Sequence, residues 1–75
     1  MKIFYISYTG ILEPLGESQV LSYLEKLTKH YSCKIILVTF EKKKYLINDL
    51  LLKKKYQYLL NKGIDWKYFT YNQNN

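Results

Sequence analysis

The residues with the clearest chemical potential lie in one short stretch near the N-terminus. Residues 9–16, TGILEPLG, contain two glycines and the only proline, which predicts a loop, and a helical pattern follows. Free backbone N–H groups and the helix dipole at such a start favour phosphate. Gly10 and Gly16 would let a ligand approach the backbone, and Ser18 and Gln19 in the first turn could donate hydrogen bonds. The stretch therefore predicts a phosphate-binding loop.

The same residues also have a purely structural explanation. Pro14 and Gly16 could only shape the turn, and Ser18 could only cap the helix, because short motifs have many false positives. The dinucleotide fingerprint G-x-G-x-x-G does not match, since the two glycines are six apart with none between them. A P-loop also fails, because Glu17 stands where the phosphate-binding lysine belongs and would repel phosphate. Kinase and ATPase functions are therefore excluded.

Apolar periodicity places this loop in a β-α-β-α-β pattern. Residues 2–8 and 33–40 are apolar runs typical of strands buried on both faces, whereas residues 64–71 alternate. The expected order is strand 2–8, loop 9–16, helix 17–31, strand 33–40, charged connection 41–44, helix 45–62, strand 64–71 and a frayed polar end at 72–75. Gly63 is expected to end the second helix.

The two expected helices differ in their apolar stripes. The first has a single face, formed by Val20, Leu24, Leu27 and Tyr31 with Leu21 beside it. The second has a main stripe of Tyr45, Leu52, Tyr56, Leu59 and Leu60, and another of Ile47, Leu51 and Tyr58 on roughly the other side. The second helix could therefore be covered on two faces.

This alternation predicts an α/β fold, a partial Rossmann-like unit with a three-stranded parallel sheet in the order 3-2-1 and right-handed crossovers. The first strand would then be an edge, although it is apolar on both faces like a central strand. Exposed edges of this kind invite association. We therefore expect either a larger protein or pairing through that edge.

The content of lysine, arginine, cysteine and histidine excludes some classes of function. The chain carries twelve lysines, no arginine and a net charge of +6. Clusters at residues 42–44 and 53–55 could face an anionic membrane or simply be solvated. The absence of arginine argues against nucleic-acid binding. One cysteine and one histidine exclude a disulfide framework and argue against a metal site.

Longer motifs give a family resemblance. The chain begins MKIFYIS, continues as GILEPLGESQV over residues 10–20 with Tyr23-Leu24 after it, and has GIDWKYFTY at residues 63–71. In these features it resembles the N-terminal domain of glycosyltransferase family 4 enzymes. The resemblance covers nearly the whole chain and implies the first piece of a GT-B fold. Residues 1–75 would then be a single partial, acceptor-side domain, with the second domain absent.

The resemblance also implies an activity and its partners. Family members transfer a sugar from a nucleotide-sugar donor to a glycan or lipid-linked acceptor, often for surface polysaccharides, with retention and without a metal or cofactor. Gly16 would approach the donor sugar and diphosphate through its N–H, Gly10 would leave room, Pro14 would direct the loop, and Ser18 and Gln19 would bind substrate or brace the loop. No catalytic residue is expected in this stretch. Glu17 and Glu25 have the spacing of the family's donor-site glutamates but lie in the wrong domain.

The sequence therefore predicts a glycosyltransferase fragment that is inactive alone, cytoplasmic or peripheral at the inner face of the membrane. Two alternatives stay open. One is an interaction subunit that pairs with a partner chain through its open sheet edge. The other is a small basic nucleic-acid-binding module, which would show a steep salt dependence of binding.

Overall fold

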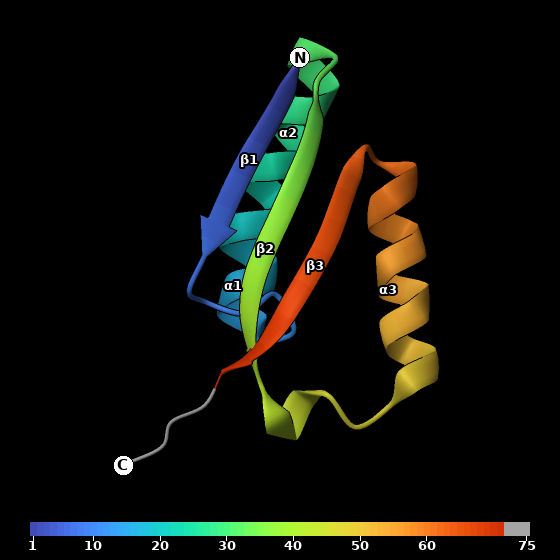
Figure 1. The fold of residues 1–75 in the computed structure, drawn as a ribbon. Coiled ribbons are helices and arrows are strands. Elements are labelled where there is room, and N and C mark those ends of the chain that lie inside the picture. The colour runs from blue at the N-terminus through green and yellow to red at the C-terminus, as the bar shows by residue number, and fades with distance from the viewer. Residues whose placement is uncertain (72–75) are drawn as a thin grey trace.

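Three parallel strands form the sheet that the alternating pattern predicts (Figure 1). In the computed structural model, which describes residues 1–71, β1 (Lys2–Ser7) pairs with β2 (Lys34–Lys42), and β2 pairs with β3 (Ile64–Tyr71). The strand order β1-β2-β3 makes β2 central and confirms the predicted α/β fold, compatible with a partial Rossmann-like unit. The frayed end predicted for residues 72–75 lies outside the described residues.

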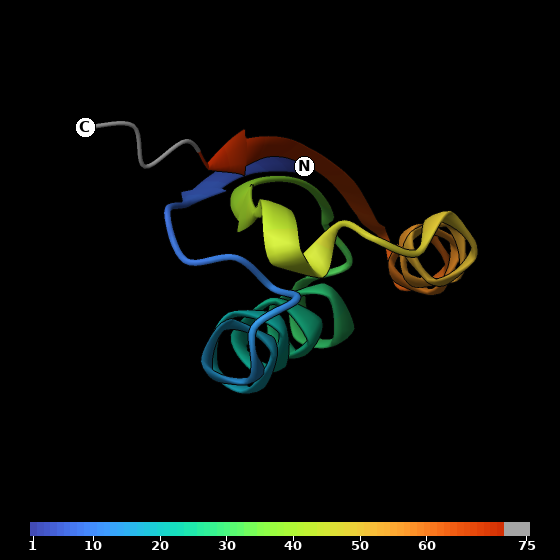
Figure 2. The ribbon, with the colours of Figure 1, turned by 90° about the horizontal axis from the view of Figure 1, so that it is seen from below.

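The connections between the strands are helical. A continuous helical segment follows β1 and consists of α1 (Pro14–Gly16), the π-helical turn η1 (Glu17–Leu21) and α2 (Ser22–Tyr31). After β2 come the 3₁₀ turn η2 (Lys43–Tyr45) and α3 (Asp49–Asn61). Figure 2, which looks onto the end of the sheet where the strands finish, shows α2 below the sheet and α3 beside β3.

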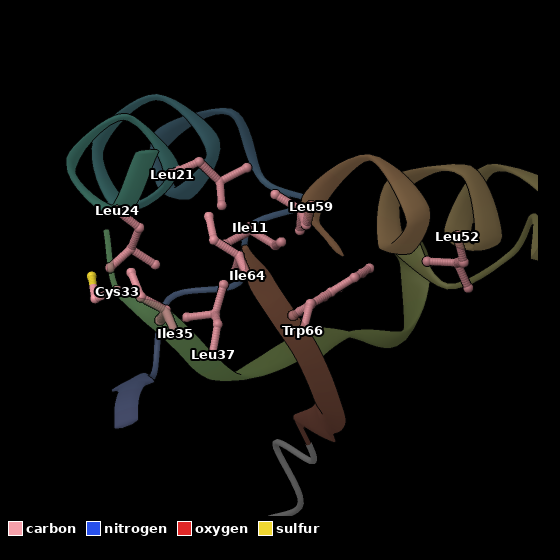
Figure 3. Packing of buried hydrophobic residues seen from close by; sticks show 10 residues of the cluster. All are labelled: Ile11, Leu21, Leu24, Cys33, Ile35, Leu37, Leu52, Leu59, Ile64 and Trp66. Carbon is pink, nitrogen blue, oxygen red and sulfur yellow. The ribbon is translucent and has the colours of Figure 1, made fainter. Parts of the chain in front are cut away.

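One hydrophobic core lies between the sheet and these helices (Figure 3). Along β2, alternate residues face it: Ile35 and Leu37 are buried, whereas Ile36 and Val38 are only partly buried. Leu24 of α2, Leu59 of α3 and Trp66 of β3 meet them in the same cluster. The other members are Ile11, Leu21, Cys33, Leu52 and Ile64.

Three predicted boundaries differ from the structure by more than one residue. The first helix starts at Pro14 rather than residue 17, because proline suits the first helical position, where no backbone N–H is needed. The second strand continues to Lys42, so Glu41 belongs to the sheet and not to a charged connection. The second helix starts at Asp49 rather than residue 45, since the Asn48 side chain accepts a hydrogen bond from the Leu51 N–H and caps it. The end of that helix at Gly63, with φ of 85°, is confirmed.

The helices leave two apolar surfaces uncovered. The predicted second stripe is exposed at Ile47, which precedes α3, and at Leu51 and Tyr58 of α3. Of the main stripe only Leu52 and Leu59 are buried, so within residues 1–71 α3 packs through this pair and has no second covered face. On the sheet, Phe4 of β1 is 63% exposed and Phe69 of β3 is 58% exposed, because both point away from the helices. The face of the sheet opposite the helices is therefore bare, and β1 is an edge strand as the sequence predicts.

Candidate ligand-binding loop

The loop after β1 is fastened to the end of β2 by a buried carboxylate. Glu41 has no exposed surface. Its Oε2 accepts a hydrogen bond of 2.9 Å from the Ile11 N–H, and its Oε1 accepts one of 3.1 Å from the Leu12 N–H. A carboxylate that accepts bonds from backbone N–H groups forms strong, charge-assisted contacts. Glu41 thus joins the loop to the end of β2 and fixes the path of its backbone.

Two further side chains, one from β2 and one from β3, extend this hydrogen-bond network. The Thr39 hydroxyl donates to Glu41 Oε2, and the indole Nε1–H of Trp66 donates to Thr39 Oγ1 over 2.9 Å. Thr39 is fully buried and Trp66 nearly so. Each donor therefore has an acceptor, and a loop, a central strand and an edge strand are joined in one network. Trp66 is therefore a core residue with an additional polar role.

The two glycines of the loop touch each other and leave no room for a side chain. A Cβ on Gly16 would lie 2.8 Å from the carbonyl carbon of Gly10 and closer still to its oxygen. A Cβ on Gly10 would lie 2.8 Å from Cδ of Glu41 and closer still to Oε1. The space freed by each missing side chain is thus filled by the protein itself. Internal packing explains both glycines, and their role toward a ligand stays a prediction.

The remaining predicted binding residues lie on the helix that starts in this loop. Pro14 is exposed at its first position, and Ser18 and Gln19 are exposed in η1, one turn later than predicted. The Ser18 hydroxyl donates to the Leu15 carbonyl over 3.2 Å, so Ser18 does not cap the helix start. The cap position is Glu13, whose side chain makes no capping bond. The structure therefore brings Gly10 and Gly16 into contact and presents Ser18 and Gln19 on the adjoining turn.

Lysines neutralise the acids nearest to this helix start. Lys42 Nζ lies 3.3 Å from Oε1 of Glu13, and Lys55 of α3 pairs with Glu17. The second pair also joins α3 to the helical segment after β1. Since Glu17 was the residue expected to repel phosphate, its pairing with Lys55 reduces that repulsion at short range.

The helix start offers backbone hydrogen-bond donors, and its two carboxylates, Glu13 and Glu17, are each paired with a lysine. The first intrahelical bond runs from the Glu17 N–H to the Glu13 carbonyl, so the N–H groups of Leu15 and Gly16 precede it and lack intrahelical partners. Glu41, the nearest buried acid, is saturated by its own donors. Among residues 1–71, no group of three or more His, Cys, Asp or Glu side chains is placed to hold a metal ion.

Sequence reasoning missed Glu41 and Thr39, although the signal was present. Alternation along CKIILVTFE places Thr39 and Glu41 on the same face as Ile35 and Leu37. The end of the apolar run instead predicts that Glu41, a charged residue, lies in the connection at residues 41–44. Continuing the two-residue period would have placed the carboxylate inside, where it needs the donors of the loop.

The resemblance has no independent support from wider comparisons. No protein-family model, curated protein or solved structure matches the chain.

Proposed function

We propose that the chain is the acceptor-side β-α-β-α-β unit of a glycosyltransferase that resembles family 4, which moves a sugar from a nucleotide donor to a glycan or lipid-linked acceptor. The observation that carries this proposal is the fixed loop at the carboxyl end of β1. Its Ile11 and Leu12 N–H groups are held by Glu41, so the helix start with Gly16, Ser18 and Gln19 has a defined position. In open parallel sheets, ligands bind at this end of the strands.

In this proposal the unit binds the substrate, and its residues do not catalyse the transfer of the sugar. At the helix start, the N–H groups of the exposed Leu15 and of the buried Gly16 precede the first intrahelical bond, and the proposal places a diphosphate there because the helix dipole favours an anion. The described residues of the loop and helix start supply no free acid or base to assist transfer. We therefore expect the 75 residues alone to bind nucleotide sugars weakly and to transfer no sugar.

Titration of ¹⁵N-labelled protein with UDP-, GDP- and ADP-sugars tests this proposal by NMR. At millimolar ligand, we expect the largest amide shifts at Leu15, Gly16, Ser18 and Gln19. Loss of one hydrogen bond in Ser18→Ala should weaken binding about 2- to 10-fold. Ser22→Ala removes a hydroxyl that is also exposed, one turn further on, and this variant should bind like the parent.

Two results would count against the proposal. One is the absence of shifts at these four amides with every nucleotide sugar. The other is a set of shifts that the free nucleosides reproduce in full, since recognition would then not involve the diphosphate.

The bare face of the sheet favours a second function, that of a subunit completed by a partner. It carries Phe4 and Ile6 of β1 beside an aromatic row in which Tyr8 stacks on Phe40 at 5.2 Å between centroids, and Phe40 stacks on Phe69 at 5.9 Å. Parallel sheets are normally covered on both faces, usually by helices. A partner with an apolar helical face would suit this surface, and the unpaired edge of β1 lies beside it.

Self-association provides a direct test of this second function. Without a partner, the bare face should make the chain associate at micromolar to millimolar concentration, and the double variant Phe4→Lys/Phe69→Lys should be monomeric by analytical ultracentrifugation. Leu50→Lys, which changes a similarly exposed apolar residue on α3, should associate like the parent. A stable pair needs to bury roughly 1,200 Å² of surface in total. A parent protein that stays monomeric at 1 mM would therefore argue against an interaction surface on the sheet.

A further inference from the structure

A groove lies beside the loop, at the start of α3, and the proposed nucleotide-sugar site does not use it. Its volume is about 580 Å³, and its lining includes Leu12 of the loop with Ile47 and Leu51. Ile47 is 84% exposed and Leu51 is 61% exposed. Large apolar side chains gathered along a groove and left in water are typical of a surface that receives an apolar ligand.

The polar part of the lining is cationic. Lys44, Lys54 and Lys55 line the groove, and no carboxylate does so within the described part of the chain. Lys55 is paired with Glu17, whereas Lys44 and Lys54 form no ion pair among residues 1–71. Two ammonium groups are therefore available to a negative group on a ligand.

One face of the aromatic side chain at the groove is already occupied by a lysine. Lys44 Nζ lies 5.2 Å from the centroid of the Tyr45 ring and covers one face of it by a cation–π contact. A nucleobase that stacked there would have to displace this ammonium. The groove is thus better suited to an aliphatic ligand than to a base.

From the apolar lining and the two available lysines, we propose that this groove binds a single-chain anionic amphiphile, with the aliphatic chain along Leu12, Ile47 and Leu51 and a phosphate or carboxylate between Lys44 and Lys54. Long lysine side chains suit such a site, because their methylene stems can lie along the apolar chain while the ammonium meets the anion. The site is independent of the nucleotide-sugar proposal, since it uses different residues.

Titration of the ¹⁵N-labelled chain with octyl phosphate below its micelle concentration tests the inference. We expect saturable amide shifts at Leu12, Ile47, Leu51 and Lys54. Inorganic phosphate, which has no chain, and octyl glucoside, which has no charge, should each bind at least tenfold more weakly. Vesicles of phosphatidylglycerol distinguish the free amphiphile from a lipid surface, because the groove should bind the monomeric ligand without them.

Paired variants test whether the lysines at the groove act specifically. Lys44→Gln/Lys54→Gln should weaken octyl phosphate binding at least fivefold, and Ile47→Ser should do so without removing a core residue. Lys26→Gln/Lys29→Gln removes the same charge from exposed positions of α2 and should leave binding unchanged. Equal binding of inorganic phosphate or octyl glucoside, equal loss in the control pair, or binding to vesicles only would overturn the inference. If octyl phosphate does not bind but nucleotide sugars still shift the Gly16 amide, the groove proposal fails and the proposed function stands.

Discussion

Replacing Glu41 by glutamine should lower the free energy of unfolding by about 1–3 kcal/mol, the usual loss when a buried donor is left without an acceptor. The carboxylate uses both oxygens, one toward Ile11 and Thr39 and the other toward Leu12. An amide keeps the shape but has only one oxygen, so its NH₂ group must face at least one of these donors. For a chain of this length the whole stability is roughly 4–11 kcal/mol, so the loss is a large share.

Urea unfolding followed by circular dichroism measures this effect. The matched control is Glu25→Gln, which removes the same charge from a partly exposed position of α2. The only hydrogen bond of the Glu25 side chain in the described structure is one of 3.5 Å from the Tyr58 hydroxyl, so this control should change stability little. If Glu41→Gln were as stable as Glu25→Gln, the carboxylate would not be the anchor of the loop.

Gly16→Ala is expected to destabilise the chain in spite of a favourable helix propensity. Gly16 has helical φ and ψ of −64° and −41°, so alanine would gain about 1 kcal/mol over glycine if there were space. The new Cβ would instead lie 2.8 Å from the carbonyl carbon of Gly10, which is closer than van der Waals contact allows. Backbone atoms cannot turn aside as a flexible side chain can, and overpacking of this kind costs about 1–3 kcal/mol, occasionally more.

The clash should therefore outweigh the propensity gain and lower the melting temperature by several degrees, at roughly 4–8 °C per kcal/mol for a domain of this size. Gln19→Ala lies on the same helical segment but is exposed, so it should melt at or slightly above the parent temperature. A Gly16→Ala variant that gained stability would show that the loop can move away, and that Gly10 and Gly16 do not need to touch.

The sequence predicted the strands and their order because hydrophobic period and length decide those features locally. The patterns of residues 2–8, 33–40 and 64–71 each predict a strand by themselves. The order of the strands follows from the doubly wound fold that the β-α-β-α-β alternation indicates. Gly63 was likewise predictable, since a positive φ after a helix favours glycine at that one position. These conclusions need no knowledge of tertiary contacts.

The candidate site was predictable only in part, because its stability comes from a contact between distant residues. Gly10 and Gly16 were recognised as special, but their reason, contact with each other and with Glu41, depends on a carboxylate some thirty positions along the chain. The sequence predicts a second covered face on this helix because an apolar stripe shows which side chains are hydrophobic. The stripe does not show whether another element packs on them. Among the described residues 1–71, no element packs on Ile47 and Leu51, and both are exposed.

The most direct test of the account is amide hydrogen exchange of Ile11 and Leu12, measured by NMR in the parent chain and in Glu41→Gln. Hydrogen-bonded, buried amides exchange only when the structure opens. We predict that both amides exchange as slowly as those in the middle of β2, and that they exchange rapidly in the variant. If Ile11 and Leu12 of the parent exchange as fast as the exposed residues Ile47 and Asn48, the loop is not held by Glu41, and the preformed ligand site is wrong.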